Sequence, residues 1–461
     1  MNAYEEKEIQ PIPERIKSLS TSLPFLFSLG ALIFLISFLI SFLISSFPLG
    51  TNPLNTDGIE RVYFADNIGV GQAEIIRQFN ELYSGEVEVI AIDLPFSKFN
   101  TNQRKDLIAR NLRSRSSRID VFSVDLIWVP RFTKWAEPLA PYFAPQFLNK
   151  LVPQPLETCY VDDILYAIPL YTDIGALYFR KDMILELPDG EAIVERIKNS
   201  ITWEELLELR EKYFSGKPMF VPQAVAYEGL ICNFNEILGV TLQDDSTGEL
   251  LDLLDPLVIE RTRFMKEMIQ TNFAPREALD MVEDDCIRFA LANDIPFVRG
   301  WPTVNNENYR RFDAELFKKL EIAPVPHFAG SEPTPVFGGW NMMLSRHSPV
   351  KDAAILFMKF AASMQGQSIF YDNEGLLPIQ REFYENRSSD PHQERVQLIQ
   401  RLMMKGIHRP MLHQYTLMSD ILSLRLHQIL SGELSVESGL GLAKEEIDAV
   451  TECLKAGWLG G

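Results

Sequence analysis

The sequence predicts an α/β fold with a largely parallel sheet, preceded by a single membrane-spanning helix near the N-terminus. Strand-like segments alternate with amphipathic helices from about residue 58 onward, and a long apolar run without charge precedes them. Such alternation is typical of α/β folds with helices on both faces of the sheet. The composition, 46% hydrophobic and 23% charged over 461 residues, is that of a globular chain long enough for more than one core.

The apolar run has the length of a membrane span. No charged residue occurs between Ser18 and Thr56, and residues 23–47 are almost continuously apolar. About 20 apolar residues suffice for a helix to cross a bilayer, whereas the core of a cleavable signal peptide has only about 7–15. No small-residue cleavage pair and no cysteine follows the run directly. We therefore expect an uncleaved transmembrane anchor at about 23–47.

The basic residues beside the run predict its orientation. Lys7, Arg15 and Lys17 precede it, and no basic residue follows it before Arg61. Because positive charge is retained on the cytoplasmic side of a membrane, the N-terminus is expected to be cytoplasmic. Residues 1–57 would then form a cytoplasmic tail, the anchor and a short tether, and the rest of the chain would lie in the periplasmic or extracellular space.

The first part of the soluble region alternates between strand and helix. Strands are predicted at 61–65, 87–92 and 119–128, and helices with apolar residues on one face at 73–83 and 102–112. In sheets of this kind, ligands bind beyond the carboxyl ends of the strands. Asp125 falls at such a position.

A second α/β region is predicted to begin near Ile168. Helices are expected at 202–213, 257–268, 284–292, 349–363, 393–404 and 437–454. Thr202 and Glu205 have the spacing of a capping box, in which each side chain accepts a hydrogen bond from the other residue's backbone N–H. This pair predicts that the helix begins at Thr202.

Charge and cysteine content exclude several classes of function. The formal net charge of −19 opposes binding to nucleic acid. The basic stretch 104–118 contains no aromatic residue for base stacking, so it is interpreted as a solvated helix face and loop. Cys159, Cys232, Cys286 and Cys453 have no metal-ligand spacing. We expect no metal and no cofactor, and we interpret the cysteines as buried free thiols, with a disulfide as the alternative.

Several short segments combine the residue types that bind sugars. Aromatic rings cover the apolar face of a pyranose, and carboxylate or guanidinium groups pair with its hydroxyls. The segments that supply this mixture are 125–128 (DLIW), 171–173 (YTD), 227–229 (YEG), 299–302 (RGWP), 338–340 (GGW) and 408–410 (HRP). Trp128 and Trp135 are interpreted as core residues.

Taken in order, these segments resemble the trehalose/maltose-type solute-binding proteins of bacterial and archaeal ABC importers, family 1 of the extracellular solute-binding proteins. Further stretches that carry the resemblance are IIRQFNELYSGEVEV, RIDVFSVDLIWVPRF, TWEELLEL, YEGLICNFNEI, GGWNMMLSRHSPVKDAAILFMKF and RPMLHQYTLMSDIL. The most specific is YAIPLYTDIGALYFRKD. The similarity extends from about residue 58 to the C-terminus.

The resemblance implies a two-lobed periplasmic-binding-protein-like fold of type II, with hinge crossovers and closure of the lobes on the ligand. Lobe one is expected at 58–166 and 327–378, and lobe two at 167–326 and 379–461.

The resemblance also implies the residues that bind the ligand. Those expected to contact the sugar are Arg104, Asp125, Tyr171, Asp173, Trp301, Gly339, Trp340 and Arg409. Tyr227 and Glu228 would either contact the sugar or buttress the pocket. The loop 66–72 departs from the family because it lacks an obvious acidic residue where the relatives offer one to the sugar.

The implied function is that of the substrate-binding component of an ABC transporter. It would capture a small oligosaccharide or glucoside of the trehalose, maltose, sucrose or glucosylglycerol type and deliver it to a membrane permease driven by a cytoplasmic ATPase. No enzymatic activity is expected. The alternatives are a membrane-anchored glycoside-processing enzyme that uses Asp125 and Asp173 as its carboxylate pair, and a tethered sugar sensor.

Overall fold

The computed structural model describes residues 58–95, 98–99, 101–114, 118–243, 250–302, 315–385 and 393–455. The chain divides into two compact units, Met1–Asp57 and Gly58–Gly461, and all described residues belong to the second. The predicted anchor at about 23–47 lies outside the described residues. Among the helices that are described, none is both long enough and apolar enough to cross a bilayer.

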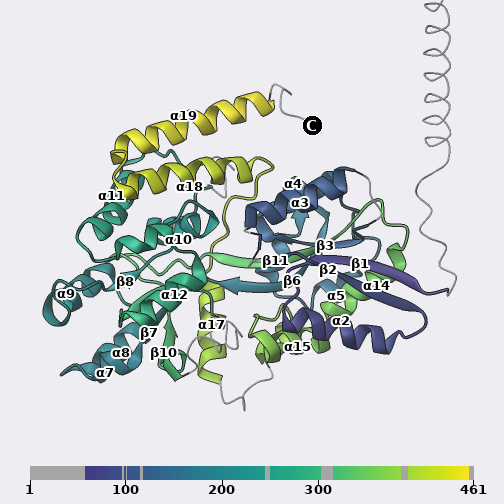
Figure 1. Ribbon diagram of the computed structural model, residues 1–461, viewed down its shortest axis with the longest axis horizontal. Helices are drawn as coiled ribbons and strands as arrows, with labels where there is room; N and C mark the ends of the chain where they lie inside the picture. The colour runs from purple at the N-terminus through teal and green to yellow at the C-terminus, as the bar shows by residue number, and fades with distance from the viewer. Residues whose placement is uncertain are drawn as a thin grey trace, which may run out of the picture. The chain divides into compact units, whose positions relative to one another are not determined.

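The described part of the chain contains a five-stranded sheet with the order β2-β1-β3-β11-β6 (Figure 1). Its strands are β1 (Glu60–Asp66), β2 (Val87–Asp93), β3 (Val121–Asp125), β6 (Ala167–Ile174) and β11 (Phe337–Leu344). β1 pairs in parallel with β2 and with β3, as predicted. β11 runs antiparallel to both β3 and β6, so the sheet is mixed. The prediction of a largely parallel sheet is therefore correct only for the strands nearest the N-terminus.

Helices cover both faces of this sheet. α3 (Thr101–Arg113) lies on one face, and α2 (Val70–Leu82), α14 (Lys351–Ala361) and α15 (Met364–Glu374) lie on the other (Figure 1). The core beneath α14 is aromatic, because the ring centroid of Phe357 lies 5.1 Å from that of Phe64 and 5.3 Å from that of Phe79. Packing of α14 joins a segment late in the chain to the first strand.

The described residues also contain a second, four-stranded sheet with the order β10-β7-β9-β8. Its strands are β7 (Ala176–Arg180), β8 (Phe220–Val221), β9 (Phe297–Gly300) and β10 (Leu320–Ala323). The helices associated with it include α8 (Gly190–Asn199), α9 (Trp203–Tyr213), α10 (Glu228–Leu238), α11 (Pro256–Gln270), α12 (Glu283–Ala292), α18 (Tyr415–Ser431) and α19 (Val436–Lys455).

Local sequence signals place several of these elements correctly. The capping box of α9 forms as predicted: Thr202 Oγ1 accepts from the Glu205 N–H at 3.1 Å, and the Glu205 carboxylate accepts from the Thr202 N–H at 2.9 Å.

The remaining described elements are η2 (Leu126–Trp128), α4 (Val129–Phe132), η3 (Thr133–Trp135), α5 (Pro145–Leu148), α6 (Pro153–Glu157), β4 (Tyr160–Val161), β5 (Ile164–Leu165), α7 (Lys181–Leu185), η4 (Arg276–Asp280), α16 (Arg381–Glu385) and α17 (Gln393–Lys405).

The chain passes between the two sheets where β6 ends and β7 begins. Gly175 alone separates them, so Ile174 belongs to the first sheet and Ala176 to the second. A second passage leads from β10 in the second sheet to β11 in the first. At the crossing the two passages are joined, because the Gly175 N–H donates to the Val336 carbonyl at 2.9 Å.

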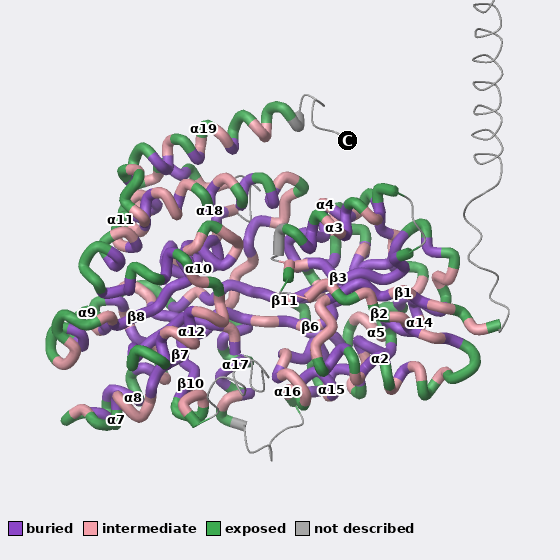
Figure 2. The backbone as a smooth tube through the Cα atoms, viewed as in Figure 1, coloured by how far each residue is buried: buried purple, intermediate pink, exposed green. Residues whose placement is uncertain are grey.

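The burial of some residues matches the interpretation of the sequence, and the burial of others differs from it (Figure 2). Trp128 and Trp135 are buried, as expected. Cys159, Cys232 and Cys286 are buried free thiols, whereas Cys453 on α19 is exposed, contrary to the interpretation. The basic stretch is also not a solvated face throughout. Arg104 and Lys105 on α3 are both buried.

Candidate ligand-binding site

Strand β11 brings several of the predicted binding residues together. In the register of the sheet, Gly338 faces Asp173 of β6, and Trp340 faces Asp125 of β3 on one side and Tyr171 of β6 on the other. The pairing with β6 is irregular directly after Trp340. Residues widely separated in the chain therefore meet where the two sheets adjoin.

Gly339 permits this close approach of β6 and β11. Its φ of +125° is a conformation that residues with a side chain rarely adopt, and a Cβ there would lie 2.7 Å from the Tyr171 carbonyl oxygen. A larger residue would push the two strands apart. Position 339 therefore requires glycine, and the contact of its backbone with ligand stays a prediction.

Arg104 packs behind Trp340. Its guanidinium carbon lies 4.2 Å from the Trp340 ring centroid, and its Nη2 is 2.9 Å from Asp66 Oδ1. Asp66 also accepts hydrogen bonds from the Ser123 hydroxyl and the Asn67 N–H. Burial raises the pKa of Asp66, and the charge of Arg104 opposes that rise. Asp66 therefore fixes the guanidinium, which supports one side of the Trp340 ring.

Glu374 supplies an acidic group at the loop 66–72. It ends α15 and accepts a hydrogen bond from the Gly71 N–H at 2.8 Å, so its carboxylate lies at the N-terminus of α2. The Tyr171 hydroxyl lies nearby: burial raises its pKa well above the ordinary value, with Asp66 and then Glu374 adding to the effect. No local pattern indicates a role for Glu374, because 303 positions separate it from Gly71.

Asp125, Arg409 and Glu228 form a connected group, called here the Arg409 triad. Arg409 Nη2 lies 3.0 Å from Asp125 Oδ1, and its Nη1 lies 2.7 Å from Glu228 Oε1. Burial alone would lower the pKa of Arg409, but the carboxylates of Asp125 and Glu228 hold it well above the ordinary value. Three of the predicted site residues therefore bind one another.

The triad is further tied to α18. Glu228, the first residue of α10, accepts hydrogen bonds from the Tyr415 hydroxyl at 2.5 Å and from the Ser419 hydroxyl. Asp125 also caps η2 by accepting from the Ile127 N–H at 3.2 Å. Both carboxylates are thus engaged by protein donors. Asp125 is in an ion pair, which does not favour its use as a free acid or base in glycoside cleavage.

Asp173 and Trp301 converge on Gly338. A Cβ on Gly338 would lie 2.9 Å from Trp301 Cζ3 and 3.3 Å from Asp173 Cβ, so the absence of a side chain makes room for both. Asp173 accepts a hydrogen bond from the Ile174 N–H at 3.0 Å. Burial raises the pKa of Asp173 to about 7. This carboxyl group retains capacity to accept hydrogen bonds from a ligand.

Tyr227 precedes α10 and faces the start of α12. Burial raises the pKa of its hydroxyl well above the ordinary value, and Glu283 adds to the rise. Burial also raises the pKa of Glu283, which interacts with the Tyr227 hydroxyl. Glu283 was not among the residues expected from the sequence.

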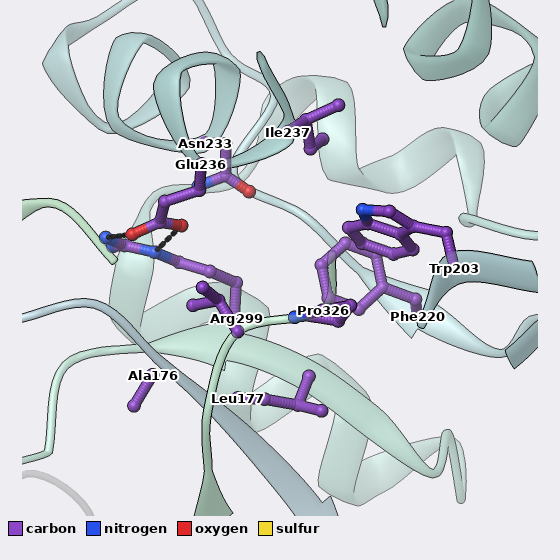
Figure 3. Close-up of a pocket in the computed structure, with 10 residues that line it drawn as sticks. Ala176, Leu177, Trp203, Phe220, Asn233, Glu236, Ile237, Arg299 and Pro326 are labelled. Carbon is purple, nitrogen blue, oxygen red and sulfur yellow. Dashed lines mark hydrogen bonds and ion pairs between the residues drawn. The ribbon is translucent and has the colours of Figure 1, made fainter. Parts of the chain in front are cut away.

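Two of the cavities among the described residues of unit 58–461 lie away from these side chains. One, of about 10 Å³, lies between the bonded pair Arg299–Glu236 and the rings of Trp203 and Phe220 (Figure 3). The other, of about 140 Å³, lies among Leu242, the segment 250–253, α18 and α19. Neither is lined by a predicted binding residue, and both are smaller than the roughly 300 Å³ of a typical small-molecule pocket. The candidate site therefore rests on the convergence of side chains.

Comparison with known proteins gives a family match. The model of the bacterial extracellular solute-binding protein family matches residues 68–368. A probable ABC transporter-binding protein of Deinococcus radiodurans is 23% identical over 278 residues, which are 58% of this chain and 64% of that protein. The match thus spans less than two thirds of this relative's length.

Solved structures have the same fold. Maltose-bound MalE3 of T. maritima gives a TM-score of 0.72 at 24% identity, covering 85% of this chain and 100% of its own. The GacH receptor of Streptomyces glaucescens, solved unliganded and with acarbose, gives 0.70 at 20% identity, covering 86% and 98%. These likenesses establish the α/β, two-lobed periplasmic-binding-protein-like fold for this chain.

Proposed function

Because this chain belongs to the bacterial extracellular solute-binding protein family, we propose that it is the substrate-binding component of an ABC transporter for a small oligosaccharide or glucoside. The family consists of binding proteins rather than enzymes, in agreement with the sequence analysis. The observation that carries the sugar assignment is the convergence of Asp173 and Trp301 at Gly338 of β11, two positions along that strand from Trp340.

The residue chemistry suits a neutral polyhydroxy ligand. Trp301 and Trp340 offer apolar ring surfaces for the C–H faces of pyranoses. Asp173 offers a carboxylate to hydroxyl donors, and the Tyr171 hydroxyl and the Arg104 guanidinium are proposed as further polar contacts. The Arg409 triad is assigned the role of holding the site's shape, with Tyr227, directly before α10, as its neighbour. The relatives named for maltose and acarbose support this class of ligand.

The proposal includes attachment and delivery. Residues 23–47 would anchor the protein with its N-terminus in the cytoplasm, and the unit from residue 58 would face the periplasmic or extracellular space. Lobes at 58–166 with 327–378 and at 167–326 with 379–461 would close on the sugar, with the first boundary moved from 166 to Gly175 because β6 belongs to the first sheet. The closed form would then dock on a permease driven by a cytoplasmic ATPase. The named ABC transporter-binding relative supports this assignment.

A thermal-shift screen of the full chain in detergent tests the ligand class. We expect trehalose, maltose, sucrose or glucosylglycerol to raise the melting temperature, because a ligand at 100 times its Kd stabilises the native state by about 2.7 kcal/mol. A representative amino acid and a polyamine serve as controls. A shift with either control and with none of the sugars would overturn the proposal.

A further inference from the structure

Arg299 is buried beneath the Trp301 ring and was not among the residues expected to contact the sugar. Its guanidinium carbon lies 3.8 Å from the ring centroid, and only 2% of its side chain is exposed. A guanidinium at this distance over an indole is held by cation–π attraction and by stacking of the two planes. The position of the ring is therefore coupled to the position of the guanidinium.

All three guanidinium nitrogens of Arg299 donate hydrogen bonds, and Figure 3 shows those to Glu236. Its Nε and Nη2 donate to the two oxygens of Glu236 at 3.0 and 2.8 Å, and its Nη1 donates to Gln223 Oε1 at 3.1 Å. A two-point bond between planar groups sets direction as well as distance. Glu236 is on α10 and Arg299 is on β9. A helix and a strand of the four-stranded sheet's region therefore set the orientation of the guanidinium plane against which the Trp301 ring packs.

The Arg299–Glu236 ion pair also contacts the two chain segments that pass between the sheets, at Gly175 and at Val336. Glu236 Oε1 accepts from the Val336 N–H at 3.3 Å, just before β11. A Cβ on Gly175, between β6 and β7, would collide with the Glu236 carboxylate and lie 2.9 Å from Arg299 Nη2. The pair therefore touches both passages of the chain between sheets, within a few residues of Asp173 and Gly338.

From these contacts we infer that Arg299, fixed by Glu236 and Gln223, is a positioning residue that holds the Trp301 ring as a stacking surface for ligand at the crossing of the two sheets. Arg299 does this without touching the ligand. The inference rests on the proposed function for its link to sugar affinity, whereas the effect on the ring can be observed in the ligand-free protein.

A double-mutant cycle tests the link to affinity. Arg299→Lys keeps the charge but removes the planar stack and the two-point bond, and we expect it to weaken binding of the best sugar about tenfold by calorimetry. In a Trp301→Leu background the same change should weaken binding less than about twofold, because the ring on which it acts is gone. Arg180→Lys is the matched control: Arg180 is a buried, ion-paired arginine of β7, and its change should leave affinity unaltered.

The ligand-free readout separates failure of this inference from failure of the sugar assignment. The near-UV circular dichroism band lost on Trp301→Leu should be altered by Arg299→Lys and retained in Arg180→Lys. If Arg299→Lys does not fold, Gln223→Met takes its place, because it removes the bond to Arg299 Nη1 together with the longer bond from Asn233 Nδ2 at 3.4 Å and leaves the Arg299–Glu236 pair intact. An unaltered band, or an equal loss of affinity in both backgrounds, would overturn the inference. Absence of sugar binding with an altered band would reject the proposed function alone.

Discussion

Two carboxylates on either side of β11 differ in what they already bind. Asp125 is paired with Arg409, which also holds Glu228. Asp173, within the described residues, accepts a hydrogen bond from the Ile174 N–H next to it in the chain. Both were expected to bind ligand on the same grounds. The difference indicates that a carboxylate can bind ligand only where its oxygens are not already occupied by donors from the folded protein.

The electrostatics follow from this difference. Burial raises the pKa of both carboxyl groups, but for Asp125 the charge of Arg409 counteracts burial. For Asp173 the opposing effects are the Ile174 N–H and the more distant charge of Arg299, and its pKa reaches about 7. A ligand hydroxyl would supply Asp173 with a donor beyond the Ile174 N–H that it has among the described residues. The triad is therefore interpreted as structural and Asp173 as functional.

The largest expected effect comes from breaking the triad. Arg409→Met leaves the largely buried carboxylates of Asp125 and Glu228 without their cation, and should lower the free energy of unfolding by about 3–5 kcal/mol. Urea unfolding at pH 7 measures this. Arg425→Met is the control, because Arg425 pairs with Glu446 where the side chains are 20% and 38% exposed, and should cost at most about 1 kcal/mol. Equal losses for the two variants would show that the triad carries no special structural role.

The elements of this fold were largely predictable because their signals are local. The helix at 202–213 and the strand at 87–92 appear within one or two residues of the predicted bounds, since periodicity and caps act over a few positions. The direction of β11 and the contacts of Glu374 and Arg409 depend on residues more than about 160 positions away in the chain. The burial of Arg104 on α3 was missed because its partner, Asp66, lies at the end of β1, 38 positions earlier in the chain.

A smaller effect is expected from the ionisation of Asp173. With a pKa of about 7, roughly a tenth of these groups are ionised at pH 6 and nine tenths at pH 8. Because a hydroxyl donates to the ionised form, sugar affinity should rise about tenfold across this interval. Calorimetry at pH 6, 7 and 8 measures it. Asp173→Asn should bind more weakly and lose the dependence, and a variant that keeps the wild-type profile would contradict the role of Asp173.

The same group should affect stability with a defined sign. Its pKa in the folded chain is above the value of 3.8 for an ordinary aspartate. The stability contributed by Asp173 is thus fully present below about pH 4 and is lost as the pH rises through about 7. In Asp173→Asn, the melting temperature should fall less between pH 4 and pH 7 than in the wild type. An identical fall in both proteins would mean that other groups cause it.

The smallest expected effect comes from removing one hydrogen bond to Glu228 of the Arg409 triad. Tyr415→Phe removes a donor to Glu228, which keeps its bonds from Arg409 and Ser419. The cost should be about 1 kcal/mol of unfolding free energy, with sugar affinity unchanged within about twofold. Tyr384→Phe is matched to it, because the Tyr384 hydroxyl is buried and donates to a neutral acceptor, the Pro378 carbonyl. If Tyr415→Phe weakened sugar binding as much as Asp173→Asn does, Glu228 would have to act on the ligand, and the separation of a structural triad from a functional Asp173 would fail.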